Sequence, residues 1–302
     1  MIIALAFLAA ADLVVGVSND AVNFLNSALG SKALSFKTIM ITASVGIAIG
    51  AIFSSGLMEV ARKGIFNPGE FFFNEIMIIF MAVMITDILL LDFFNTVGMP
   101  TSTTVSIVFE LLGASVAMSL IKMGQNDSSI SELGNYINTT KASQIIIGIL
   151  LSVAIAFPIG DLIQYVVRTL LSFYFQNKAK WTSALFGGFA ASAITYFILI
   201  KGLKVVSFVS EDILNYIQDN TTVIIVYLLA FWLLISLIFV YAFRVNVYKF
   251  IILIGTFGLA LSFAGNDLVN FIGVPIAAWQ SYEAWVTSGI AASDFSMEVL
   301  AA

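Results

Sequence analysis

Apolar segments long enough to cross a lipid bilayer recur along this chain of 302 residues and constrain its fold more than any other feature. Hydrophobic residues make up 60% of the sequence and charged residues only 10%, and the mean hydropathy is +1.04. A hydrocarbon core about 30 Å thick requires roughly 20 consecutive apolar residues in a helix. Backbone polar groups in lipid must also be hydrogen-bonded within the protein. The sequence therefore predicts an all-α integral membrane protein.

The expected spans differ in what they carry besides apolar side chains. Small residues at Ala43, Gly46 and Gly50 favour close contact between helices. Residues 122–142 are polar and form the clearest extramembrane loop. The stretch 205–218 has apolar residues at helical spacing beside acidic ones, and it either lies on the membrane surface or forms a short linker helix. The spans are expected at residues 2–17, 38–58, 74–94, 105–121, 143–171, 181–200, 221–243 and 248–264.

The absence of two residue types limits the chemistry of the chain. It contains no cysteine and no histidine, so disulfides, thiolate metal sites and imidazole bases are excluded. The net charge of -5 and the lack of a basic patch argue against nucleic acid as a partner. Lysine and arginine do not alternate sharply between the connecting segments, so the membrane orientation is not predicted.

A polar motif occurs twice, nearly the whole chain apart. Residues 18–23 and residues 265–270 both contain Asn-Asp-x-x-Asn inside apolar sequence. Carboxylates and amides are costly at bilayer depth, and a single copy could serve as a hydrogen bond between helices. Two copies in matching contexts instead indicate one shared site, with the helix broken at each copy.

A third motif, Gly-Met-Pro-Thr-Ser-Thr-Thr at residues 98–104, is typical of a helix N-terminus. Hydroxyls and free N–H groups at such a terminus can bind an oxyanion. Asp20 and Asp267 would repel that anion unless a cation lies between them, and sodium accepts carboxylate, amide and carbonyl oxygens as ligands. The alternative for the hydroxyl run is simple packing within the membrane. Four further acidic residues are each expected near an interface or beside a polar neighbour: Asp87, Asp92, Glu110 and Asp161.

These motifs, with residues 28–31 and the extension of the second copy to Pro275, resemble the inorganic phosphate transporter (PiT) family over essentially the whole chain. The resemblance implies a symporter that carries inorganic phosphate with sodium or protons, multi-pass in the cell (inner) membrane and usually a homodimer within the lipid bilayer. It implies an inverted-repeat fold with broken helices and half-helix hairpins. Sodium is the implied coupling ion, and no other cofactor is expected. The implied sodium ligands are Asp20, Asn23, Asp267 and Asn270, and the implied substrate site adds Ser102, Thr103 and Thr104 to these four.

The sequence departs from the family pattern at three places. Val105 stands where the family usually has histidine, and residues 38–58 hold no acidic residue before Glu59. No second Ser-Thr-Thr cluster occurs before Ala302, which predicts a truncated second repeat. The expected organisation is a first inverted repeat at 1–121, a polar loop at 122–142, connecting membrane helices at 143–243 and the start of a second repeat at 244–302.

Three alternatives remain open at the level of sequence. Sulfate resembles phosphate in size and tetrahedral shape, so a sulfate permease of the same fold fits the motifs. An intramembrane aspartyl hydrolase could use Asp20 and Asp267 as a dyad, although the Tyr-Asp and Gly-x-Gly-Asp contexts expected of it are missing. A passive channel or structural subunit would not need duplicated broken helices.

Overall fold

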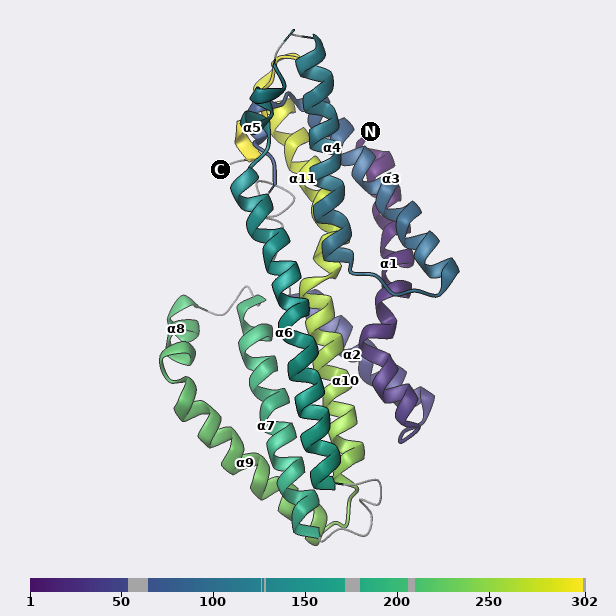
Figure 1. The fold of residues 1–302 in the computed structure, drawn as a ribbon, viewed down its shortest axis with the longest axis vertical. Coiled ribbons are helices and arrows are strands. Elements are labelled where there is room, and N and C mark those ends of the chain that lie inside the picture. Colours follow the sequence, from purple (N-terminus) through teal and green to yellow (C-terminus); the bar gives the residue numbers. More distant parts are fainter. Residues whose placement is uncertain (54–64, 126, 128, 172–179, 206–209, 301–302) are drawn as a thin grey trace. The chain divides into compact units, whose positions relative to one another are not determined.

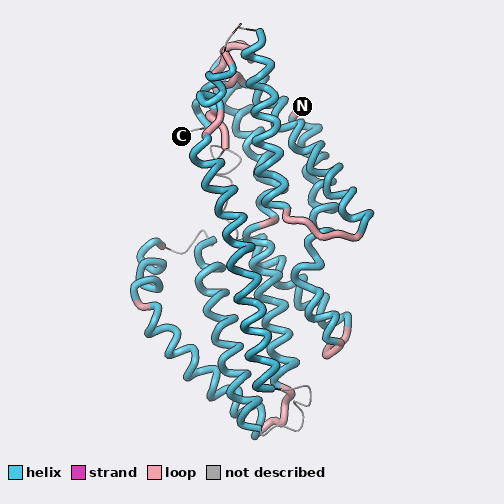
Figure 2. The backbone as a smooth tube through the Cα atoms, in the orientation of Figure 1, coloured by secondary structure: helices cyan, strands magenta, loops and turns pink. Residues whose placement is uncertain are grey.

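The computed structural model describes residues 1–53, 65–125, 127, 129–171, 180–205 and 210–300. Within these ranges the chain forms helices joined by short connections, together with two isolated β-bridges (Figures 1 and 2). Seven of the described helical segments are long and apolar enough to cross a membrane. The prediction of an all-α, multi-pass membrane protein is therefore confirmed. The α-helices are α1 (Ile2–Ser31), α2 (Phe36–Phe53), α3 (Phe73–Val97), α4 (Thr103–Gln125), α5 (Leu133–Tyr136), α6 (Thr139–Leu171), α7 (Lys180–Val205), α8 (Glu211–Asp219), α9 (Thr221–Tyr241), α10 (Val247–Asn266) and α11 (Leu268–Ser288).

The helices overrun the expected polar loop at both of its ends. α4 continues to Gln125 and α6 already begins at Thr139. The end of the span expected at 38–58, including Glu59, lies outside the described residues. α8 covers part of the expected amphipathic stretch, and its place at a membrane surface stays a prediction.

The expected helix break at the first Asn-Asp-x-x-Asn motif is wrong. α1 runs without interruption from Ile2 to Ser31. Polar side chains of the motif form hydrogen bonds that leave the helix intact: the Ser18 hydroxyl donates to the Val14 carbonyl oxygen at 2.8 Å, and Asn23 Nδ2 donates to Asp20 Oδ1 at 3.2 Å. Because unpaired backbone groups are costly in lipid, a continuous helix is favoured wherever the side chains find partners in this way.

The break at the second motif is present but short. α10 ends at Asn266, Asp267 is a turn residue, and α11 begins at Leu268. α11 then runs for 21 residues to Ser288 with Pro275 inside it.

The described chain divides into two compact units. The first unit comprises 1–23, 56–151 and 266–302. In it, α3 packs against α4 and α11, and the Phe73 and Trp285 rings stack with their centroids 4.6 Å apart. Its apolar core includes the fully buried side chains of Phe66, Phe71 and Phe80.

One end of the first unit joins segments that are distant in sequence. Isolated β-bridges pair Phe66 with Ile137 and Phe72 with Ser296. Lys122 forms a 2.9 Å ion pair with Glu75, and its ammonium lies 4.2 Å from the centre of the Phe72 ring. These contacts hold the ends of α3, α4 and α11 together.

The second unit comprises 24–55 and 152–265. Here α2 meets α10 through the predicted small residues. A Cβ placed on Gly46 would lie 2.8 Å from the Phe257 carbonyl oxygen, and one on Gly50 would lie 2.6 Å from that of Leu261. The prediction of a close helix contact at these glycines is confirmed.

Candidate functional site

Asn19 of the first motif fixes the segment that leads into α4. Its side chain is 3% exposed. Nδ2 donates to Asn95 Oδ1 at 2.9 Å, and Oδ1 accepts the N–H of Thr101 at 2.8 Å. Asn95 Nδ2 in turn donates to the Val15 carbonyl oxygen at 3.0 Å. The asparagine pair therefore ties α1 to both sides of the α3–α4 connection.

A left-handed residue shapes that connection. Gly98 ends α3 with φ of 70°, and its N–H donates to the Asn95 carbonyl oxygen at 3.1 Å. Glycine adopts this conformation at little cost because it lacks a Cβ. The chain turns there and passes through Pro100 before α4 begins at Thr103.

Asp20 lies beside the first turn of α4. Its carboxylate is 3% exposed, and its Oδ2 accepts a hydrogen bond from Thr103 Oγ1 at 3.2 Å. The other oxygen, Oδ1, accepts from Asn23 Nδ2 at 3.2 Å. A buried carboxylate with only two neutral donors retains strong negative potential, so it favours a nearby cation.

Thr104 connects the same turn to the second motif. Its Oγ1 donates to Asp267 Oδ1 at 3.2 Å and accepts from Asn270 Nδ2 at 2.8 Å. Consecutive threonines of α4 therefore contact one Asn-Asp-x-x-Asn motif each. The two aspartates also interact electrostatically with each other.

Ser102 has a different position from the two threonines. It precedes α4, is exposed, and its Oγ accepts the N–H of Val105 at 3.4 Å, as a helix-capping side chain does. The first N–H groups of any helix have no carbonyl partner within it. The start of α4 thus combines an exposed hydroxyl with unpaired backbone donors. All seven predicted site residues come together in the first unit.

Several residues around the site were not among those predicted. Asn19 could have been identified because it belongs to the duplicated motif, whereas the sequence around Asn95 carries no comparable signal. Asp87 and Glu110 each lie beside a polar neighbour, which was one of the two expectations for them. Ser106 Oγ lies 2.7 Å from a carboxylate oxygen of each. Their position next to buried Asp12 was not predicted.

The oxygen atoms around the start of α4 could act as ligands of a hard cation. Among the described residues, no three acidic, histidine or cysteine side chains converge as metal ligands. The site offers a mixture of carboxylate, amide and hydroxyl oxygens, which suits a weakly bound hard cation. Asp20, Asn23, Asp267 and Asn270 supply the carboxylate and amide oxygens of this set.

The proteins found to be similar to this chain have names or descriptions that refer to phosphate. A protein of Mycobacterium bovis named as a phosphate permease is 24% identical over 165 residues, which cover 54% of this chain and 29% of that protein. A Mycobacterium tuberculosis protein of the same description matches equally. The chain therefore matches less than a third of the length of these relatives. A solved structure described as the sodium-dependent phosphate transporter matches with a TM-score of 0.65 and 19% sequence identity. The match covers 98% of this chain and 71% of the chain in that structure.

The solved structure supports the fold, and the match to a sequence family shows to which family the chain belongs. The description of that family is "Phosphate transporter family", and its match extends over residues 16–301. This range includes both Asn-Asp-x-x-Asn motifs and the start of α4. The family is one of transporters and not of enzymes, which removes the aspartyl hydrolase alternative. The chain belongs to the phosphate transporter family.

Proposed function

We propose that this chain binds inorganic phosphate at the start of α4 and carries it across the membrane together with sodium. The observation that carries the proposal is the pair of hydrogen bonds from Thr103 to Asp20 and from Thr104 to Asp267. Through these hydrogen bonds, both copies of the Asn-Asp-x-x-Asn motif contact the N-terminus of α4. Family membership and the names of the similar proteins support phosphate as the substrate.

The anion would be held by donors without a full positive charge. The positive end of the α4 dipole and its unpaired N–H groups attract an oxyanion. Ser102 adds an exposed hydroxyl whose oxygen accepts the Val105 N–H, so its hydrogen can point to the anion. The Thr104 hydroxyl already donates to Asp267, which places phosphate close to that carboxylate.

That proximity gives sodium its role. Two ionised aspartates beside a phosphate would repel it by several kcal/mol at the effective dielectric of a partly buried site, where unit charges 4 Å apart interact by about 4 kcal/mol. A sodium ion between the carboxylates and the anion attracts both and so offsets much of this repulsion. Binding of phosphate and sodium should therefore be mutually dependent, with each raising the affinity for the other.

Uptake into proteoliposomes tests the proposal. Radiolabelled phosphate and radiolabelled sulfate are compared with an inward sodium gradient, with equal sodium on both sides and with potassium in place of sodium. We expect phosphate accumulation that requires the sodium gradient and is not inhibited by excess sulfate. Accumulation driven equally well without sodium would overturn the coupling, and preferential accumulation of sulfate would overturn the substrate.

Binding to the purified protein separates recognition from transport. Equilibrium binding of radiolabelled phosphate in detergent, at saturating and at zero sodium, should show an affinity at least ten-fold higher with sodium. Cross-linking of the protein in native membranes would independently test the homodimer that the resemblance to the PiT family implies. A strictly monomeric product would contradict that part alone.

A further inference from the structure

A second group of acidic side chains lies inside the first unit, away from the start of α4. Asp12 of α1 and Asp87 of α3 are both 0% exposed, and Glu110 of α4 is partly buried. Asp87 is within hydrogen-bonding reach of the carboxyl groups of both Asp12 and Glu110. These three residues are called the inner carboxyl cluster below.

The inner carboxyl cluster contains too few hydrogen atoms if all three side chains are ionised. Ser106 Oγ lies 2.7 Å from Asp87 Oδ1 and 2.7 Å from Glu110 Oε1. A serine hydroxyl has one hydrogen and can donate to only one of these oxygens at a time. The second short contact, like each contact between two carboxyl groups, needs a proton on a carboxyl oxygen.

Asp12 gives a separate indication of a bound proton. Neither of its carboxyl oxygens receives a hydrogen bond from an N–H or O–H group of the described residues, although the side chain is fully buried. The groups that act on it electrostatically are Asp87 and Glu110, which are both acidic. An ionised carboxylate without donors or countercharge is very costly at such a place, and the neutral acid removes most of that cost.

A metal ion is a poorer explanation of the same cluster. No three acidic side chains of the described residues are arranged to ligate one ion together. Protons need no such convergence, because each one bridges a single pair of oxygens. The geometry therefore favours protons over a metal as the species that neutralises the cluster.

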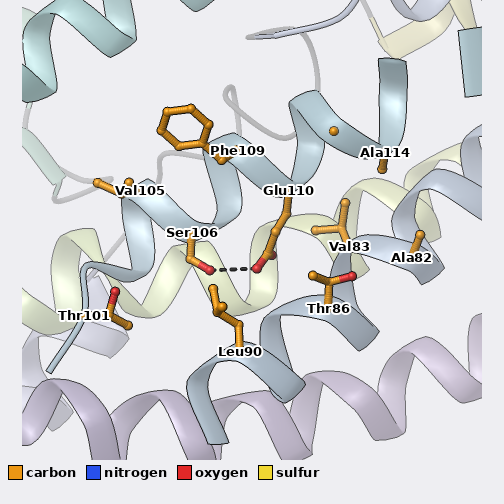
Figure 3. Close-up of a pocket in the computed structure, with 11 residues that line it drawn as sticks. Ala82, Val83, Thr86, Leu90, Thr101, Val105, Ser106, Phe109, Glu110 and Ala114 are labelled. Carbon is orange, nitrogen blue, oxygen red and sulfur yellow. Dashed lines mark hydrogen bonds between the residues drawn. The ribbon is translucent and has the colours of Figure 1, made fainter. Parts of the chain in front are cut away.

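An access route is present at one end of the cluster. Glu110 and Ser106 line a pocket of about 480 Å³ together with the hydroxyl-bearing residues Thr86 and Thr101 (Figure 3). Figure 3 shows the Glu110 carboxyl and the Ser106 hydroxyl directed toward each other beside Thr86. Water in this pocket could exchange a proton with Glu110, while Asp12 lies at the fully buried end.

We propose that Asp12, Asp87 and Glu110 form a proton-binding site that is distinct from the site at the start of α4 and holds at least one exchangeable proton. The exchange is a simple transfer: a hydronium ion in the pocket gives its proton to Glu110 and becomes water. The proton then moves between adjacent carboxyl oxygens through the hydrogen bonds around Asp87.

The cluster is also electrically linked to the site at the start of α4. Asp87 acts electrostatically on Asp20, which itself interacts with Asp267. Loss of a proton from the cluster would add negative charge near Asp20 and favour a cation there. This consequence rests on the proposed function, whereas the proton-binding site does not.

Infrared difference spectroscopy of the purified protein tests the proton directly. Protonated carboxylic acids have a C=O stretching band that carboxylates lack and that shifts in D2O. We expect this band at neutral pH, and we expect it to disappear as the pH is raised. Asp12→Asn, Asp87→Asn and Glu110→Gln should each remove intensity equivalent to at least part of one carboxyl group.

Asp92→Asn is the matched control, because Asp92 is an exposed carboxylate on the same helix as Asp87. It should leave the band unchanged. The amide variants resemble the neutral acids in shape, so they should keep the melting temperature and the detergent-solubilised size. If a variant does not fold, the dependence of this band on pH and on D2O in the unaltered protein still tests the proposal. The proposal is overturned if no such band exists at neutral pH, or if all three variants retain its full intensity.

Discussion

Thr104 Oγ1 donates a hydrogen bond to Asp267 Oδ1 at 3.2 Å, across 163 positions of sequence. The same oxygen accepts a hydrogen bond from Asn270 Nδ2 at 2.8 Å. One hydroxyl therefore joins the first turn of α4 to two of the three polar residues of the second motif. Its neighbour Thr103 does the same for Asp20 of the first motif. A change at either threonine should thus act on one motif and spare the other.

Thr104→Val should weaken phosphate binding about ten- to a hundred-fold. Valine keeps the shape of threonine but leaves Asp267 without its hydroxyl donor, and a hydrogen bond to a charged group contributes about 1.5 to 3 kcal/mol. Thr104→Ser retains the hydroxyl and should bind nearly as the unaltered protein does. Equilibrium binding of radiolabelled phosphate measures both. Ser119→Ala is the matched control, since the Ser119 hydroxyl donates to the Ser115 carbonyl oxygen of its own helix. Equal losses of phosphate affinity in Thr104→Val and Ser119→Ala would contradict the prediction.

Ser102→Ala should lower both stability and phosphate affinity, because Ser102 caps α4 and presents a hydroxyl to the proposed anion. Loss of a cap costs about 0.5 to 2 kcal/mol. Ser102→Asp separates the two roles: aspartate caps a helix well but repels an anion. We expect this variant to keep the melting temperature and to bind phosphate more weakly than the alanine variant. Phosphate affinity that follows the melting temperature across both variants would assign Ser102 to capping alone.

Asp20→Asn should abolish most of the sodium dependence of phosphate binding. The substitution keeps the shape of the side chain and its contact with Thr103 but removes the negative charge that attracts the cation. The measurement is phosphate affinity as a function of sodium concentration. Asp161→Asn, on the exposed surface of α6, should leave the sodium response unchanged. An undiminished sodium response in Asp20→Asn would show that Asp20 is not a sodium ligand.

Asn19→Ala should destabilise the protein by roughly 2 to 4 kcal/mol. The side chain is buried and holds Asn95 and the Thr101 N–H, and each buried partner left without a hydrogen bond costs about 1 to 3 kcal/mol. Thermal unfolding monitored by size-exclusion chromatography gives the change in melting temperature. Asn74→Ala removes an exposed asparagine from α3 and should have little effect. Similar melting temperatures for the two variants would contradict the role assigned to Asn19.

Gly50→Ala should destabilise the second unit, whereas Gly30→Ala should not. A Cβ at Gly50 would lie 2.6 Å from the Leu261 carbonyl oxygen and 2.7 Å from Ala264 Cβ, so α2 and α10 must move apart. No atom lies within 4 Å of a Cβ placed at Gly30, and alanine is the better helix former there. We expect a cost of about 1 to 3 kcal/mol at Gly50, as for other overpacked contacts. A melting temperature that is equal or higher in Gly50→Ala would disprove a tight contact.

The membrane fold and the chemistry of the motifs follow from the amino-acid sequence alone. Long apolar segments form helices in lipid because a helix pairs its backbone N–H and C=O groups within one segment. The small residues at Gly46 and Gly50 predicted close helix packing, and the structure has it. The duplicated Asn-Asp-x-x-Asn motif singled out Asp20 and Asp267, because polar residues at bilayer depth are too costly to occur without a purpose.

The pairing of these residues depends on how the helices pack, which no local pattern in the sequence encodes. The two copies of the motif differ in their backbone, since α1 continues through Asp20 whereas Asp267 separates α10 from α11. Thr103 contacts Asp20 and Thr104 contacts Asp267 because consecutive side chains of a helix point in different directions. Asp12, Asp87 and Glu110 lie on three different helices, and no local pattern in the sequence encodes their contact. Sequence fixes which groups must avoid lipid, but their burial partners depend on packing between segments that are distant along the chain.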